Sequence, residues 1–271
     1  MSDLLDLTVS AAHVAGALLA ERAGHPGRTS TKSSDVDMVT EFDIAAGVLI
    51  ARELASGDPG TPLVIEEPEV YALAGVREGA LDAPAVWVVD PIDGTTSFIH
   101  GFPAFSVSIA RLEYGQPVLG VVFNVPLAET FGAEAGLGAT CNGAPISASD
   151  AETVDRSLVV TGFPYDRGAP LTRQLAVLGA MLRTVHGIRR DGSAAVDCCH
   201  VACGRADAFW EFGLRPWDTS AGMLIAREAG AIISALDGSP WSPGVPDVLV
   251  AAPRLYPVIL EAIRASDPGP L

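Results

Sequence analysis

Residues 86–98 read VWVVDPIDGTTSF and join an apolar run to a polar turn. The run at residues 86–89 predicts a buried strand, which ends on Asp90. A proline stiffens the turn that follows, and this turn presents Asp93 before the chain enters a short helix at residues 94–96. The order of these parts places two carboxylates at the carboxyl end of a strand.

Asp90 and Asp93 are three residues apart on this turn, so their carboxylates can converge on one cation. Mg²⁺ prefers such hard oxygen ligands and keeps coordination places for phosphate. The backbone carbonyl of Ile92 lies between the two acids and offers a third oxygen. The amino end of the next helix is a natural seat for a phosphate, formed by Gly94, Thr95 and Thr96. A turn with an Asp cap would explain one Asp and one Gly, but not the whole string.

The string at residues 90–96 resembles the signature of the inositol monophosphatase family, the lithium-sensitive, magnesium-dependent phosphatases. A second family signature matches residues 217–222 and runs into residues 228–230. Because both motifs occur in the family's order, the resemblance is specific, and it extends from about Lys32 to Gly238. It implies a mixed α+β and α/β fold, the layered α-β-α-β-α sandwich of the inositol monophosphatase and fructose-1,6-bisphosphatase type.

Four acids stand at the ends of apolar strands or the starts of helices: Glu66, Asp90, Asp93 and Asp218. Brought together they would repel one another, and divalent cations would relieve that repulsion. The resemblance implies two or three Mg²⁺ ions held by Glu66, Asp90, the Ile92 carbonyl, Asp93 and Asp218. It also implies catalytic roles for Glu66 and Thr95, which would orient the attacking water, and for Asp43, which matches a metal-site acid. Two residues ahead of Asp43 match a family lysine and a family aspartate, namely Lys32 and Asp37.

Some of these acids have an ordinary structural alternative. Asp43 follows Thr40 by three residues, which predicts an acidic variant of the capping box. Asp218 precedes a predicted helix, where an aspartate is usually the N-cap. The family has Gly-Glu-Glu where this chain has Ile65 before Glu66, and isoleucine cannot adopt every backbone conformation open to glycine. The path of the loop that carries Glu66 is therefore left open.

Residues for substrate choice are expected in the second half of the chain. Residues 192–194 match a family segment that lines the substrate pocket, and Glu211 matches an acid that accepts hydrogen bonds from sugar or cyclitol hydroxyls. Without the resemblance, the first would be a helix start and the second a solvated strand end. Arg189 and Arg190 could meet a phosphate, although an exposed pair before a turn is the favoured interpretation. The expected substrate-binding residues are Asp93, Gly94, Thr95, Thr96, Gly192, Ser193, Ala194, Glu211 and Asp218.

The chain has 271 residues, a formal net charge of −16 and a hydrophobic content of 49%. These values are typical of a globular protein, and the acidity argues against direct binding of nucleic acid or an anionic membrane. No apolar run reaches the roughly 18 to 20 residues that span a bilayer, so a cytoplasmic location is expected. The four cysteines are expected to be buried thiols. The expected partners are a small phosphorylated substrate and a second copy of the chain, since relatives are commonly dimers.

A single phosphatase domain in two lobes is expected over residues 1–271. In the first lobe, about residues 1–146, apolar runs around a turn at residues 113–117 predict a hairpin in an antiparallel sheet flanked by helices. This would be the metal-binding lobe. In the second lobe, about residues 147–271, strands and helices alternate, as in an α/β layer that would bind the substrate.

The sequence thus predicts a Mg²⁺-dependent phosphomonoesterase that hydrolyses inositol 1-phosphate, or a similar small polyol phosphate, with metal-activated water. Phosphatases of histidinol phosphate, fructose 1,6-bisphosphate and 3′-phosphoadenosine 5′-phosphate share these motifs and are the alternatives within the class. An interaction protein on a phosphatase scaffold is the alternative of another class, because some bacterial relatives are described as RNA-polymerase-associated factors. The repelling acids argue against a pure scaffold, since a lapsed enzyme has no need of them.

Overall fold

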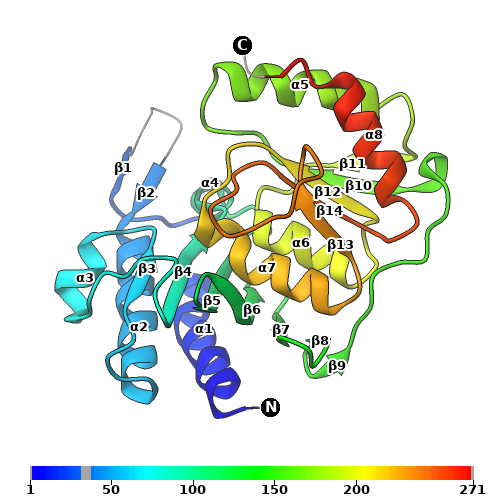
Figure 1. Cartoon of the computed structure of the whole chain (residues 1–271). Helices are drawn as coiled ribbons and strands as arrows, with labels where there is room; N and C mark the ends of the chain where they lie inside the picture. Colours follow the sequence, from blue (N-terminus) through cyan, green and yellow to red (C-terminus); the bar gives the residue numbers. More distant parts are fainter. Residues whose placement is uncertain (1, 32–37, 270–271) are drawn as a thin grey trace.

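The computed structural model describes residues 2–31 and 38–269 of the chain. Two β-sheets and three layers of helices alternate in it (Figure 1). The predicted α-β-α-β-α sandwich is therefore confirmed. A short antiparallel ribbon of β1 (Thr29–Thr31) and β2 (Met38–Thr40) stands apart from both sheets.

The larger sheet has seven strands in the order β3-β4-β5-β6-β7-β8-β9. Its strands are β3 (Leu63–Ile65), β4 (Val86–Asp93), β5 (Ser106–Glu113), β6 (Gln116–Asn124), β7 (Glu129–Glu134), β8 (Ala139–Cys141) and β9 (Ala144–Pro145). β3 and β4 run parallel and the other neighbours antiparallel, so the predicted hairpin of β5 and β6 is confirmed.

The first half of strand β4, residues 86–89, is apolar because both faces of the sheet are covered. Trp87 and Val89 face one core, which helices α1 (Asp3–Arg22) and α2 (Glu41–Gly57) close. Val86 and Val88 face the opposite core, beneath the central helices. A strand buried on both faces reads as a continuous hydrophobic run, as residues 86–89 do.

The smaller sheet has five strands in the order β11-β10-β12-β14-β13. Its strands are β10 (Leu158–Thr161), β11 (Gly187–Arg189), β12 (Ala208–Glu211), β13 (Ile232–Ala235) and β14 (Val248–Ala251). β10 is parallel to both β11 and β12, whereas the pairings of β14 are antiparallel. All three parallel strands therefore end at the same edge of the sheet.

Helices α6 (Ala194–Ala202) and α7 (Pro216–Glu228) lie between the two sheets and pack against both. Helices α5 (Ala169–Met181) and α8 (Tyr256–Ser266) cover the outer face of the smaller sheet. The remaining helical segments are short: α3 (Glu69–Ala74), α4 (Thr95–His100) and the 3₁₀ turn η1 (Val154–Arg156).

Among the described residues, α1 is long and apolar enough to cross a bilayer by length and composition alone. In this fold it packs against α2 and the larger sheet, and it buries Leu5, Ala11 and Leu19 there. The four cysteines are free thiols, as expected. Cys198 and Cys199 are buried in α6, whereas Cys141 and Cys203 are only half-buried.

Candidate active site

Three of the predicted acids meet where β4 ends beside the amino end of α7. One carboxylate oxygen each of Asp90, Asp93 and Asp218 lies within 4.8 Å of the others. The pairing of β4 with β5 shifts register between Asp90 and Asp93, and such an irregularity redirects side chains. Both acids can therefore turn toward one point although they lie on the same strand.

Carboxyl ends of parallel strands from both sheets border the pocket above these acids. Glu66 follows β3 and Asp90 ends the run of β4, and the Glu66 N–H donates to the Val89 carbonyl at 3.3 Å. Gly162, Arg190 and Glu211 stand at the ends of β10, β11 and β12. The pocket is lined by Met38, Glu66, Asp90, Ile92, Asp93, Gly94, Thr95, Gly162, Phe163, Tyr165, Arg190, Gly192, Ala194, Glu211, Leu214 and Asp218.

Burial raises the pKa values of these acids, and their mutual repulsion adds to the shift. Burial raises the pKa of Glu211 to about 8, and the charges of Asp218 and Asp93 contribute. Burial also raises the pKa of Asp93 to about 6, against the hydrogen bonds that it accepts. The pKa of Asp218 lies well above its ordinary value because of burial and the charges of Asp93 and Glu66, although a hydrogen bond with Asp90 opposes the shift.

This donor set fits a hard divalent cation. Asp90, Asp93 and Asp218 supply carboxylate oxygens, and the Ile92 carbonyl borders the same pocket. Mg²⁺ binds carboxylates and carbonyls and keeps places for water and phosphate. A bound cation would favour the ionised acids and remove the mutual repulsion that raises their pKa values.

Asp43 joins the second helix to the pocket. Its Oδ2 accepts hydrogen bonds from the Thr40 N–H at 2.7 Å and the Thr40 hydroxyl at 2.6 Å, which completes the predicted capping box of α2. Its Oδ1 lies 3.1 Å from the Thr95 hydroxyl, which is also 3.1 Å from the Ile92 carbonyl. Asp43 thus caps a helix and contacts the predicted catalytic threonine.

The segment around Gly192 holds the central motif from the other side. The Ser193 hydroxyl donates to Asp93 Oδ2 at 2.6 Å, and the Ala195 N–H donates to the same oxygen at 2.7 Å. Gly94 has φ +100°, and a Cβ there would lie 2.8 Å from the Ala104 carbonyl oxygen and 2.9 Å from that of Gly192. Only glycine fits this close approach.

Several predicted residues stand differently from expectation. Asp218 lies inside the first turn of α7, where it accepts a hydrogen bond from the Arg215 N–H at 2.7 Å, so it is not the N-cap. Neither Thr96 nor Ser193 belongs to the pocket lining. Thr96 is exposed to solvent, and Ser193 is fully buried. Two further predicted residues, Lys32 and Asp37, fall outside the described residues.

Ile65 leaves the path of the Glu66 loop undisturbed. It ends β3 with its side chain buried in the core, and it is not among the described residues with positive φ. Its N–H donates to the Tyr71 hydroxyl at 3.3 Å. The backbone therefore needs no glycine at this position.

Five lining residues were missed from the sequence: Met38, Gly162, Phe163, Tyr165 and Leu214. Arg189 and Arg190 are both exposed, as the favoured interpretation predicts. Arg190 nevertheless borders the pocket, with its guanidinium carbon 5.9 Å from the centre of the Phe163 ring. The signal for Gly162 and Arg190 was their place directly after strands that run parallel, because ligands bind at such ends.

Comparison with known proteins places almost the whole chain in the family that its motifs resemble. The profile of the inositol monophosphatase family matches residues 1–267. An inositol-1-monophosphatase from Synechocystis is 37% identical over 262 residues, which cover 97% of this chain and 89% of that protein. The Nus factor SuhB of Escherichia coli K12 is 36% identical over 266 residues, which cover 97% of each chain.

Solved structures agree with the sequence comparisons. An inositol monophosphatase from Anabaena superposes with a TM-score of 0.83 at 34% identity, covering 98% of this chain and 96% of its own. An IMPase from Thermotoga maritima gives a TM-score of 0.88 at 30% identity, and 98% of each chain is covered.

Proposed function

Because this chain belongs to the inositol monophosphatase family of phosphatases, we propose that it hydrolyses inositol 1-phosphate, or a similar small polyol phosphate, with Mg²⁺ as cofactor. The observation that carries the proposal is the meeting of Asp90, Asp93 and Asp218 within 4.8 Å in a pocket that Glu211 also lines. Asp90, Asp93 and Asp218 are suited to binding a cation that in turn binds phosphate. Glu211 is suited to accepting hydrogen bonds from the hydroxyls of the polyol.

The metal would be held by Glu66, Asp90, the Ile92 carbonyl, Asp93 and Asp218. Mg²⁺ bound there supplies charge that stabilises a transferring phosphoryl group and makes water more acidic. The chain's own part is positioning. The Thr95 hydroxyl, held between Asp43 and the Ile92 carbonyl, can orient a water and pass on its proton. Ser193 and Ala195 fix the Asp93 carboxylate.

Glu211 and Arg190 line the same pocket and would bind the rest of the substrate. A carboxylate accepts hydrogen bonds from the hydroxyls of a polyol. Burial raises the pKa of Glu211 to about 8, and the positive charge of Arg190 opposes this shift. A cation bound at the neighbouring acids would favour the ionised form that accepts such bonds. This supports a substrate with neutral hydroxyls near the phosphate.

Phosphate release with and without Mg²⁺ tests the proposal over four substrates: inositol 1-phosphate, histidinol phosphate, fructose 1,6-bisphosphate and 3′-phosphoadenosine 5′-phosphate. We expect Mg²⁺-dependent release that favours inositol 1-phosphate, and inhibition by millimolar Li⁺. A preference for another of the four would replace the proposed substrate. Release that is equal in chelator and in Mg²⁺ would contradict the role of the acids.

A second candidate follows from the relatives named Nus factor SuhB. If Mg²⁺ binds and none of the four substrates is hydrolysed, an interaction protein on this scaffold becomes the better proposal. We also propose a cytoplasmic homodimer, to be checked by sedimentation velocity and cell fractionation. The acidic charge of −16 supports protein partners over direct nucleic-acid binding.

A further inference from the structure

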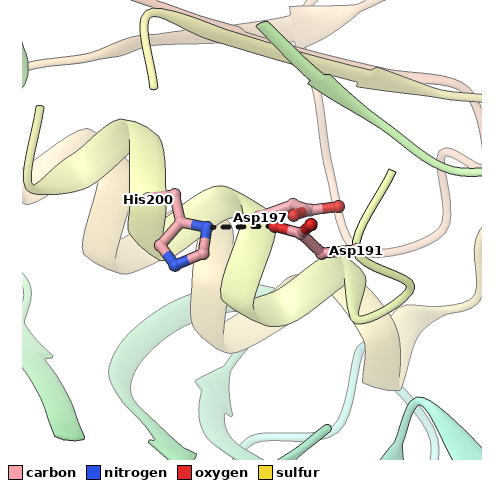
Figure 2. A group of neighbouring side chains, drawn as sticks. All are labelled: Asp191, Asp197 and His200. Carbon is pink, nitrogen blue, oxygen red and sulfur yellow. Dashed lines mark ion pairs between the residues drawn. The ribbon is translucent and has the colours of Figure 1, made fainter. Parts of the chain in front are cut away.

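A second group of potential metal ligands lies along α6 and the turn before it. Asp197 and His200 are three residues apart on α6, so their side chains lie on one face of the helix. Asp191 comes from the turn that precedes this helix, and the three side chains gather beside it (Figure 2). One ligand atom from each lies within 4.8 Å of the others.

Asp197 is the unusual member of this group. Its side chain is 1% exposed, and neither carboxylate oxygen has a hydrogen-bond partner among residues 2–31 and 38–269. Buried carboxylates are ordinarily paired, hydrogen-bonded or bound to a metal. Asp191, Glu211 and Asp93 add negative charge around it, and Arg190 opposes them. These surroundings therefore favour a cation bound to the Asp197 carboxylate.

The other two members of the group, Asp191 and His200, can complete a binding site for a cation. His200 Nδ1 lies 3.8 Å from Asp191 Oδ2, and two ligands bonded at 2.0–2.2 Å to one tetrahedral ion lie about 3.4 Å apart. Burial lowers the pKa of His200 and so favours the neutral ring, which is the form that binds metals. The Asp191 side chain is 33% exposed, which gives an ion access from solvent.

We propose that Asp191, Asp197 and His200 bind a divalent transition-metal ion of the Zn²⁺ class, at a site separate from the carboxylate site of Asp90 and Asp93. One imidazole with two carboxylates suits Zn²⁺, whereas Mg²⁺ prefers oxygen ligands throughout. Because Asp191 directly precedes the segment whose Ser193 binds Asp93, the ion positions that segment.

Nuclear magnetic resonance of the histidine rings tests this site in the full chain. With Mg²⁺ present in excess, Zn²⁺ is titrated into protein carrying ¹⁵N-labelled histidine. None of the chain's five histidines, all of which lie in the described residues 2–31 and 38–269, lines the first pocket. A shift of the His200 ring signal therefore reports the second site. We expect the His200 signal to move at one equivalent of Zn²⁺, and the signal of exposed His186 to stay. An unmoved His200 signal overturns the proposal.

Variants test whether Asp197 and His200 themselves bind the ion. Asp197→Asn and His200→Gln are each expected to weaken Zn²⁺ binding by more than about 10- to 100-fold, the usual cost of losing only an outer-shell partner. His186→Gln is the matched control and is expected to bind like the parent. Zn²⁺ affinity that survives in Asp197→Asn overturns the assignment. If either variant fails to fold, the titration of the parent chain decides the question.

Discussion

Single residues in this site do structural and chemical work together. The capping box at Asp43 and its contact with Thr95 occupy different oxygens of one carboxylate. Asp218 likewise accepts the Arg215 N–H of its helix start while it faces Asp90 and Asp93. The sequence alone poses helix cap and catalytic acid as rival interpretations, but a carboxylate with two oxygens can bond a helix start and still face the pocket.

The variant Asp93→Asn separates the structural hydrogen bonds of this residue from its charge. An asparagine oxygen can still accept from Ser193 and Ala195, and the change removes one member of a repelling group. We therefore expect hydrolysis to fall by more than about 100-fold, the upper end of what loss of an outer-shell partner costs. The melting temperature in chelator should stay level or rise. Phosphate release and thermal denaturation check this, with exposed Asp155→Asn as the control, and a collapse of the melting temperature would contradict it.

Glu211 owes its position to a glycine opposite it. A Cβ at Gly162 would lie 2.2 Å from both Glu211 carboxylate oxygens, so Gly162→Ala must displace that carboxylate. Because the Glu211 side chain can move more easily than backbone atoms, the free energy of unfolding of Gly162→Ala should change little. We expect KM for inositol 1-phosphate to rise several-fold more than KM for a plain aryl phosphate.

Gly244→Ala is the matched control for this change. A Cβ at Gly244 meets nothing within 4 Å, so its kinetics should equal those of the parent. Steady-state kinetics on both phosphates compare the two variants. Equal KM changes for the two substrates in Gly162→Ala would show that Glu211 does not read hydroxyls.

At the scale of elements, the site arises where carboxyl ends of parallel strands meet. The sequence predicts most strands and central helices, because apolar runs and glycine turns mark them. It also predicts Glu66 after β3 and the two acids in the second half of β4. It does not show which strands are parallel neighbours, since pairing joins residues far apart in the chain. For that reason Gly162 and Arg190 were missed as neighbours of Glu211.

Helix α7 reaches the larger sheet through a small residue. A Cβ at Gly120 on β6 would lie 3.0 Å from the Ala221 Cα and carbonyl oxygen, which are backbone atoms of α7. Gly120→Ala must therefore push the helix that carries Asp218 away from the sheet. We expect a loss of about 1–3 kcal/mol in the free energy of unfolding, as for other overpacked cores, and a higher Mg²⁺ requirement.

A glycine on the neighbouring strand provides the control. A Cβ at Gly132 on β7 would lie 3.6 Å from the nearest atom of Leu5, which is ordinary contact. Urea denaturation and Mg²⁺ titration of activity compare Gly120→Ala with Gly132→Ala. Equal stability of the two variants would argue against a tight contact between α7 and β6.

For the whole molecule, the acidic charge and the activity on phosphates look opposed. The net charge of −16 repels an anionic substrate, and the buried acids concentrate this charge at the pocket. Composition predicts the conflict, and the structure shows where a cation would resolve it. The number of ions depends on side-chain distances that no sequence pattern gives.

The same acids make the stability of the metal-free protein fall as pH rises. Glu211 has an ordinary pKa of 4.5 and one of about 8 in the folded chain, and Asp93 goes from 3.8 to about 6. Between these values the folded chain holds protons that the unfolded chain has released, so each rise in pH favours unfolding. Below the ordinary pKa values both states are protonated and this penalty is absent.

Urea midpoints at pH 6, 7 and 8, measured in chelator and in Mg²⁺, check the sign. Above about pH 6 most of Asp93 is ionised, so Glu211 contributes to the remaining slope together with Asp218, each by at most about 1.4 kcal/mol per pH unit. We expect the midpoint in chelator to fall toward pH 8, and to fall less in Glu211→Gln. Mg²⁺ should flatten the profile because a cation keeps the acids ionised at every pH tested. A midpoint in chelator that rises with pH would mean that these acids are not strained in the metal-free fold.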